Sequence, residues 1–353
     1  MYRLTACEVI LGGDFNSEGA GMSDFKRAVN LDALKADPQL KTHPWLRELL
    51  LRWQPAGTAA QTENWKPKNG DKKSEGARPV QLRLAIRNGY VNFYCGGQSV
   101  AKVAFGPKIT ARIHNKYLGG ADAQKYTRFD TIAQAFPDSG DLDCWIRRTH
   151  GYQGIEKTFV DLVVGANGQI IDLEMGLPAL NDASERVAPR IDLVALEPSG
   201  DGWKVVFWEA KHVKDGRIRS TTTPKVFTQL ANYATWFDAP GSLDVVRDAY
   251  RENCRVLVAL QKIAAAVWAS EGKTIPDLAA AIRAVAADPS KLVGIDSTVR
   301  LLIDNRPDPA DGKIDTHFCT AHLPRLTDPR HLPEGQKLVS VHMVNSNDAL
   351  KLP

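Results

Sequence analysis

A glutamate and a lysine separated by one residue end an apolar run in the segment "WKVVFWEAKHVKDG", Trp203 to Gly216. If this run is a strand, residues two positions apart point to the same face. Glu209 and Lys211 then project together beside Val205 and Phe207. Burying a carboxylate and an ammonium costs several kcal/mol each unless the two are paired or bind something. The pair is therefore a candidate chemical site at a strand end.

The same spacing of an acid and a lysine occurs at four other places, in helical or Gly-rich polar surroundings where solvated surface charge explains it: Asp24/Lys26, Asp71/Lys73, Glu271/Lys273 and Asp311/Lys313. Of the five pairs, only Glu209/Lys211 ends an apolar run. An α/β domain with a purely structural Glu–Lys pair is the alternative interpretation.

The preceding apolar segment, "PRIDLVALE", supplies a second carboxylate, Asp192. The link "EPSGDG" is typical of a hairpin turn, and antiparallel pairing would place Asp192 on the same site as Glu209. Two carboxylates and the backbone carbonyl of Ala210 would form a hard-oxygen site suited to Mg²⁺, with Mn²⁺ as a substitute. Such an ion polarises a phosphodiester and lowers the pKa of a bound water. Lys211 would orient or activate that water and neutralise developing charge.

Asp192 followed by Glu209-Ala210-Lys211 on successive strands resembles the PD-(D/E)xK nuclease superfamily, which has the restriction-endonuclease-like fold. The sequence "PRID" departs from a literal Pro-Asp, a departure that is common in that superfamily. The resemblance implies catalytic roles for Asp192, Glu209 and Lys211. It also implies a glutamate on the helix before the sheet, for which Glu156 is the candidate and Glu174 and Glu185 are rivals.

RecB-like members of the superfamily carry a Q-x-x-x-Y motif on the helix after the lysine strand, and "QLANY" matches it with Gln229 and Tyr233. The spacing of four residues puts both side chains on one helix face, although ordinary helix residues would show the same spacing. The resemblance covers about residues 151–237, less than a third of the chain.

Two segments could contact the backbone of a nucleic acid. The loop after Lys211 carries four cations that could hold phosphates or form a solvated surface: Lys214, Arg217, Arg219 and Lys225. Upstream, five cations alternate with three aromatic residues, a pattern that suits base stacking and equally a solvated basic surface: Lys108, Arg112, Lys116, Lys125 and Arg128 with Tyr117, Tyr126 and Phe129.

Apolar periodicity indicates the elements that must position these residues. Helices are expected over 43–53, 151–168, 224–237 and 275–288, the last with Pro276 in its first turn. Asn88-Gly89 and Gly96-Gly97 predict a three-stranded antiparallel meander within 80–105. Strands are expected over 169–180, 190–197, 203–211, 254–261 (with a helix as the alternative), 298–305 and 337–344. The predicted fold class is α/β, a restriction-endonuclease-like mixed sheet flanked by helices, behind an N-terminal α+β domain.

The predicted domains are 1–145, substrate- or partner-binding with a flexible polar loop at 54–79, and 146–353, the nuclease domain. The net charge of +4 alone does not argue for nucleic acid. The chain lacks a signal peptide pattern and an apolar run of membrane-spanning length. Its five scattered cysteines form no CxxC pair. A cytoplasmic protein that does not associate with a membrane is therefore expected.

The expected function is a Mg²⁺-dependent deoxyribonuclease, by analogy a bacterial restriction or antiviral defence effector. A non-cleaving nucleic-acid-binding or scaffold protein, a repair exonuclease and an RNase are the alternatives. The choice between endo- and exonuclease stays open, as does assembly as a homodimer or with a partner protein.

Overall fold

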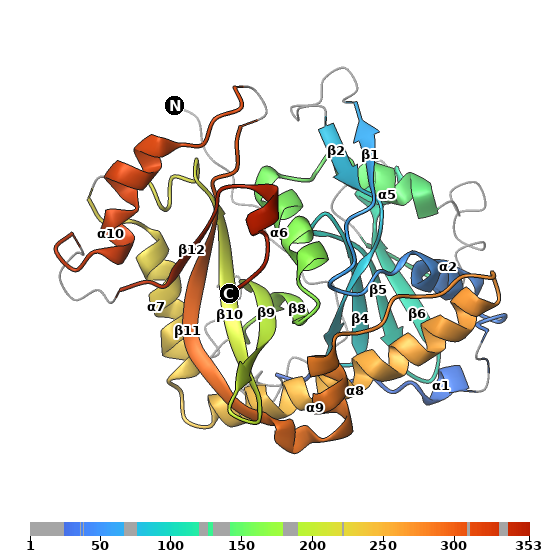
Figure 1. Cartoon of the computed structure of the whole chain (residues 1–353). Helices are drawn as coiled ribbons and strands as arrows, with labels where there is room; N and C mark the ends of the chain where they lie inside the picture. The colour runs from blue at the N-terminus through green and yellow to red at the C-terminus, as the bar shows by residue number, and fades with distance from the viewer. Residues whose placement is uncertain are drawn as a thin grey trace, which may run out of the picture.

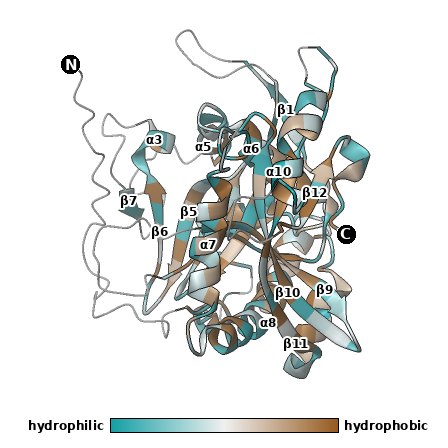
Figure 2. Cartoon of the chain, turned by 90° about the vertical axis from the view of Figure 1, so that its left-hand side faces the viewer, coloured by the Kyte–Doolittle hydropathy of each residue, from teal (hydrophilic) through white to brown (hydrophobic). Residues whose placement is uncertain are grey.

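The computed structural model describes residues 25–35, 37, 39–66, 76–119, 126–129, 142–178, 190–220, 222–308, 311–331 and 338–353. Lys125, Glu185 and residues 67–75 of the predicted polar loop lie outside this part of the chain. Two five-stranded sheets dominate the fold, one mixed and one antiparallel (Figure 1). Hydrophobic residues concentrate in the strands of both sheets, whereas peripheral elements such as β7 (Tyr126–Phe129) and α3 (Asn115–Leu118) are more hydrophilic (Figure 2).

The mixed sheet has the order β12-β11-β10-β9-β8. β8, β9 and β10 are antiparallel neighbours, and β11 and β12 continue the sheet in parallel. Its strands are β8 (Ile170–Gly176), β9 (Arg190–Ser199), β10 (Gly202–His212), β11 (Leu292–Asp304) and β12 (Val341–Val344). The strands predicted around residues 170, 190, 203, 298 and 341 are therefore present, and β9 and β10 form the expected hairpin.

Helices cover both faces of this sheet because its strands alternate apolar residues toward each face. Leu193 and Ala195 pack on α6 (Ile155–Ala166). Val194 and Phe207 belong to the core that contains α7 (Val226–Phe237) and α8 (Ser242–Ala269), and the ring centroids of Phe207 and Phe237 lie 4.7 Å apart. Because Glu209 shares the alternation of Phe207, it lies on the α7 face of its strand.

The N-terminal sheet is an antiparallel meander of five strands, β3-β4-β5-β6-β7, two more than expected. Both predicted turns are present, with positive φ at Gly89, Gly96 and Gly97. The strands are β3 (Arg83–Arg87), β4 (Tyr90–Cys95), β5 (Gln98–Phe105), β6 (Ile109–His114) and β7. Part of the predicted polar loop is also regular, since β1 (Thr62–Trp65) pairs with β2 (Gly76–Pro79). Backbone hydrogen bonds between these short segments give them a structure that their polar composition does not indicate.

The strand prediction for residues 254–261 is wrong, and the helical alternative holds. This segment lies inside α8, a helix of 28 residues that no Gly or Pro interrupts. Tyr250, Cys254, Leu257 and Leu260 recur at helical spacing and are buried. The β-branched residues in the window favour a strand locally, but burial of this stripe against the core decides the structure.

The remaining helices are short. α9 (Ala280–Ala287) begins four residues after Pro276, so the predicted helix is present and the proline precedes it. The others are α1 (Asp32–Lys35), α2 (Pro44–Arg52), α5 (Leu142–His150) and α10 (Pro324–Thr327). Within the described residues, no helix is long and apolar enough to cross a membrane.

Buried ion pairs join the N-terminal sheet to the mixed sheet. Asp172 on β8 is 1% exposed and accepts hydrogen bonds from Arg27 (2.8 Å) and from Arg87 on β3 (2.6 Å). Asp161 on α6 contacts Arg83 of β3 at 3.4 Å. One hydrophobic cluster also contains residues from both halves, from Phe25 to Val299. The predicted division at residue 145 thus lies between segments that pack closely, and it stays a prediction.

Candidate active site

Asp192 and Glu209 are brought together by the β9–β10 pairing. The register pairs Phe207 with Val194 and Trp208 with Leu193, so the next residue of each strand, Glu209 and Asp192, lie across from each other. Oδ2 of Asp192 accepts a hydrogen bond from the Ala210 N–H at 2.9 Å. Both carboxylates are buried, Asp192 at 6% and Glu209 at 3% exposure. The geometry thus places two carboxylates side by side, as the sequence predicts.

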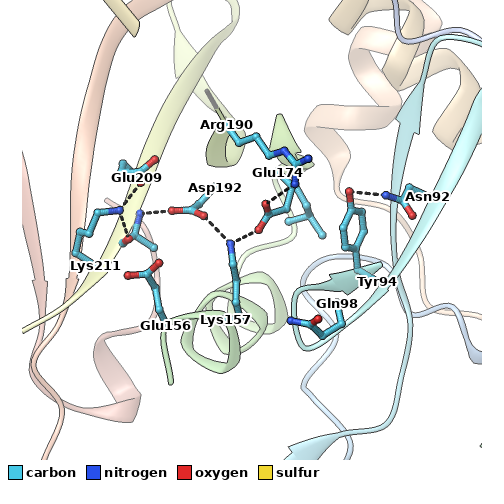
Figure 3. A network of polar contacts seen from close by, with 12 residues as sticks. Asn92, Tyr94, Gln98, Glu156, Lys157, Glu174, Arg190, Asp192, Glu209 and Lys211 are labelled. Atoms are coloured by element: carbon cyan, nitrogen blue, oxygen red, sulfur yellow. Dashed lines mark hydrogen bonds and ion pairs between the residues drawn. The ribbon is translucent and has the colours of Figure 1, made fainter. Parts of the chain in front are cut away.

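Lys211 lies on the same face as Glu209, and its ammonium contacts the Glu209 carboxylate (Figure 3). It also donates to the carbonyl oxygen of Ala210 at 2.9 Å. The side chain is only 1% exposed, so the ammonium is buried beside Glu209 and does not face solvent. Two oxygens beside the strand end, one from Glu209 and one from Ala210, satisfy the ammonium internally.

The two residues of the "QLANY" motif also reach Glu209. Nε2 of Gln229 donates to Oε1 of Glu209 at 2.6 Å, and the Tyr233 hydroxyl donates to Oε2 at 3.0 Å. Both side chains come from one face of α7, and Gln229 also donates to the Tyr233 oxygen at 2.7 Å. Oε1 of Gln229 is buried and receives no donor among the described residues. Three side chains therefore orient one carboxylate, and an unused acceptor lies beside it.

Burial and the neighbouring Asp192 charge raise the pKa of Glu209 to about 7, against the opposing effect of Lys211. Burial and the Glu209 charge likewise raise the pKa of the Tyr233 hydroxyl, which therefore stays a donor at neutral pH. Binding of a cation would lower the raised pKa of Glu209, because a nearby positive charge favours the ionised form of a carboxylate.

Glu156 lies in the first turn of α6, where burial and the charges of Lys211 and Asp192 affect its pKa. Burial raises its pKa, Lys211 counteracts this, and Asp192 adds to it. Its Oε2 atom lies 3.7 Å from Nη2 of Arg217, and no hydrogen bond joins it to either carboxylate in the described part of the chain. The structure therefore places Glu156 at the margin of the cluster.

Two further residues belong to this cluster: Lys157, which the sequence does not single out, and Glu174, which the sequence offers only as a rival of Glu156. Nζ of Lys157, next to Glu156 on α6, lies 3.0 Å from Oδ1 of Asp192 and also contacts Glu174, the former rival of Glu156 (Figure 3). Burial alone would lower the pKa of Lys157, but the charges of Asp192 and Glu174 outweigh it and raise the pKa. Glu174 has a φ of 51°, a strained value for a non-glycine residue that often marks a functional position.

The basic loop after β10 is arranged around acidic partners. Lys214 pairs with Asp308, and Arg219 lies 2.6 Å from Asp315. Arg217 binds Asp215 through two nitrogens in addition to its approach to Glu156. Lys225, just before α7, is exposed and forms no ion pair within the described residues. Phosphate binding by the first three cations therefore requires exchange of a carboxylate for a phosphate.

The donor set fits a hard divalent ion. Asp192, Glu209 and the Ala210 carbonyl supply oxygens only, which Mg²⁺ prefers. Two of these three groups contact the Lys211 ammonium, so an ion could bind there only if Lys211 turned away. No group of three or more His, Cys, Asp or Glu residues in the described ranges is arranged to hold a metal.

The chain matches no family model, no curated protein and no solved structure. The resemblance of Asp192, Glu209 and Lys211 to the PD-(D/E)xK pattern therefore depends on these residues and on their geometry.

Proposed function

We propose that this chain is a Mg²⁺-dependent nuclease with a restriction-endonuclease-like core and that its substrate is DNA. One observation carries the proposal. Glu209 is contacted by Lys211 on its own strand and by Gln229 and Tyr233 on the following helix, and it lies beside Asp192. All members of the two motifs thus meet at one carboxylate, whereas residues matched by chance would be scattered. A role in restriction or antiviral defence belongs to the same proposal.

In this mechanism Asp192, Glu209 and the Ala210 carbonyl would hold the metal ion. When bound, the ion supplies polarisation of the phosphodiester and a water of lowered pKa. Gln229 and Tyr233 keep Glu209 in one orientation, and Lys157 keeps Asp192 in place from the other side. The Lys211 ammonium, released from the Ala210 carbonyl, neutralises charge that develops on the phosphate and orients the attacking water.

A non-cleaving nucleic-acid-binding protein is the second candidate, and the buried Lys211 favours it. Its ammonium already satisfies Glu209 and Ala210, so the ion pair is complete without a metal. A buried pair of this kind can be retained for structural specificity. The two candidates differ in whether a divalent ion displaces the ammonium.

The decisive experiment incubates the purified chain with linear DNA, circular DNA and RNA, with added Mg²⁺, Mn²⁺ or EDTA. Metal-dependent cleavage that Asp192→Asn abolishes would support the nuclease. Asp201→Asn, an exposed carboxylate at the β9–β10 turn, is the matched control and should cleave normally. Binding without cleavage in either metal would favour the second candidate. Cleavage of linear DNA alone would indicate an exonuclease, and cleavage of RNA alone an RNase.

A further inference from the structure

The N-terminal sheet has an unusual charge distribution. The 44 residues from Gly76 to Gly119 contain seven Lys or Arg residues and no Asp or Glu. Arg83 and Arg87 pair with the buried Asp161 and Asp172 outside this segment. The remaining cations include Lys102 and Arg112 in the middle of the sheet.

Three cations lie side by side on one face of this sheet. The register places Lys102 of β5 opposite Arg112 of β6, and Arg112 opposite Arg128 of β7. A phosphate that contacted these side chains would reduce the repulsion between like charges directly opposite each other. The pKa of Lys102 is lowered chiefly by burial, and the nearby charges of Arg190, Arg87 and Arg112 lower it further. The opposite face of the same strands is apolar and belongs to the core.

A row of aromatic rings begins at Lys102. The Lys102 ammonium lies 5.2 Å from the centroid of the Tyr126 ring, which lies 4.9 Å from the ring of His114. The row continues from His114 to Tyr117 (6.1 Å) and from Tyr117 to Tyr152 (5.9 Å). Its two ends are accessible, with Tyr126 at 50% and Tyr152 at 46% exposure. Exposed rings beside cations are the features that proteins use to stack bases and hold phosphates of single strands.

The row ends next to the candidate active site. Tyr152 precedes Glu156 and Lys157 by four and five residues. Figure 3 shows Tyr94 of the N-terminal sheet beside Glu174, in line with Asp192 and Glu209, and Gln98 below Tyr94. Arg190, two residues before Asp192, is 63% exposed in its side chain. A strand that crossed the row would therefore continue toward the two carboxylates.

We propose that this basic-aromatic face (Lys102, Arg112, Arg128, Tyr126 and Tyr152) binds single-stranded nucleic acid and directs it to Asp192 and Glu209. The cations contact phosphates and the two exposed tyrosines stack on bases. A duplex would present its phosphates but not its base faces, so it would leave both rings unused. The binding step stands independently, and only the delivery to the carboxylates rests on the proposed nuclease function.

The test measures binding of a labelled thymidine oligonucleotide in EDTA, with RNA of the same length and a DNA duplex as parallel arms. Tyr126→Ala and Tyr152→Ala should each weaken single-strand binding roughly 5- to 100-fold, the range expected from loss of one stacked base. Tyr126→Phe, which keeps the ring, should bind like the parent. Lys102→Gln should reduce the slope of log K against log salt by about 0.7, as expected for one phosphate of a single strand.

Lys262→Gln is the matched control, because it removes one exposed charge on α8 and should leave binding unchanged. Thermal melts of all variants check folding, and Tyr152 tests the proposal independently of Tyr126. Unchanged single-strand binding in both folded alanine variants would overturn the proposal. It would also be overturned if duplex bound more tightly than the single strand and if Tyr126→Phe and Tyr126→Ala lost equal affinity. Comparison of the DNA and RNA oligonucleotides shows which of the two polymers this face binds more tightly. Failure of cleavage with intact tyrosine-dependent binding would refute the nuclease and leave this face as a binding site.

Discussion

Nζ of Lys157 lies 3.0 Å from Oδ1 of Asp192, so helix α6 provides the cation for the carboxylate that the β9 strand contributes. The same ammonium contacts Glu174 of β8. Lys157 thus connects helix α6 with strands β8 and β9 at the candidate site, and two carboxylates are paired with its charge.

We expect Lys157→Met to lower the free energy of unfolding by roughly 1–3 kcal/mol, because two largely buried carboxylates lose their cation. Methionine keeps the apolar part of the lysine side chain, so the loss of stability measures the contribution of the ammonium charge. Urea unfolding of Lys157→Met, Asp192→Asn and the double variant measures the coupling, expected at about 0.5–3 kcal/mol. A coupling near zero would mean that the contact contributes nothing to stability.

Gly97 permits the position of Lys157. A Cβ atom at this residue would lie 2.7 Å from Cδ of Lys157, and the φ of Gly97 is +71°. Gly97→Ala should therefore destabilise the chain by more than Gly89→Ala, which has a φ of +75° but open space around its Cβ position. The Gly89 variant isolates the backbone cost, about 1–2 kcal/mol. Equal losses in denaturant unfolding would show that the side chain of Lys157 simply moves aside.

The pKa of Glu209 predicts a pH dependence of stability. Since the pKa is raised from 4.5 to about 7, the folded state binds this proton more tightly than the unfolded state. The contribution to the free energy of unfolding is thus complete below about pH 4.5 and falls as the pH rises toward 7, by at most about 1.4 kcal/mol per pH unit. Denaturant unfolding in EDTA should show this fall in the parent and lose it in Glu209→Gln. The same slope in both proteins would contradict the assignment.

The paired carboxylates could be predicted because the information is local. The apolar alternation around Asp192 and Glu209, joined by the turn at Gly200, fixes both the hairpin and the face of each acid. The spacing of Gln229 and Tyr233 on one helix is equally local. These residues meet at Glu209 because helix α7 packs on the face that carries it.

The rest depends on contacts between distant segments. Lys157 looks like an ordinary helical cation in the sequence, and its position is set partly by the turn at Gly97, sixty residues earlier. The sequence alone does not predict the burial of Lys211, whose ammonium bonds to the Ala210 carbonyl and to Glu209, the carboxylate that α7 also contacts. Residues 254–261 fit a strand locally but belong to a long helix.

Acidic partners should limit phosphate binding by the basic loop. Lys214→Gln is expected to weaken duplex binding alike for all sequences and to reduce the salt slope by about 0.9. Asp308→Asn should strengthen binding, because it releases the Lys214 ammonium from its ion pair. Fluorescence anisotropy with duplexes of different sequence over a salt series measures both effects. A loss confined to one sequence would mean that the loop reads bases instead of phosphates.

Replacement of Lys211 tests both the catalytic proposal and the coupling between metal and stability. Lys211→Ala should abolish cleavage while the chain stays folded and binds nucleic acid, because the lysine neutralises charge at the reacting phosphate and takes no part in the N-terminal sheet. In EDTA we expect a loss of about 3–5 kcal/mol, since Glu209 is left as a buried carboxylate without its cation, whereas Asp192 keeps Lys157.

Mg²⁺ should restore part of this stability, because an ion bound by the two carboxylates provides the charge that the ammonium supplied. Thermal melts with Mg²⁺ and with EDTA measure the difference, and Lys211→Met separates the effect of charge from that of the cavity. The parent should gain less from Mg²⁺ than either variant, since its ammonium must first leave Glu209 and the Ala210 carbonyl. Cleavage by Lys211→Ala at the parent's rate would exclude a catalytic role for the lysine. An equal response to Mg²⁺ in all three proteins would show that the ion binds elsewhere.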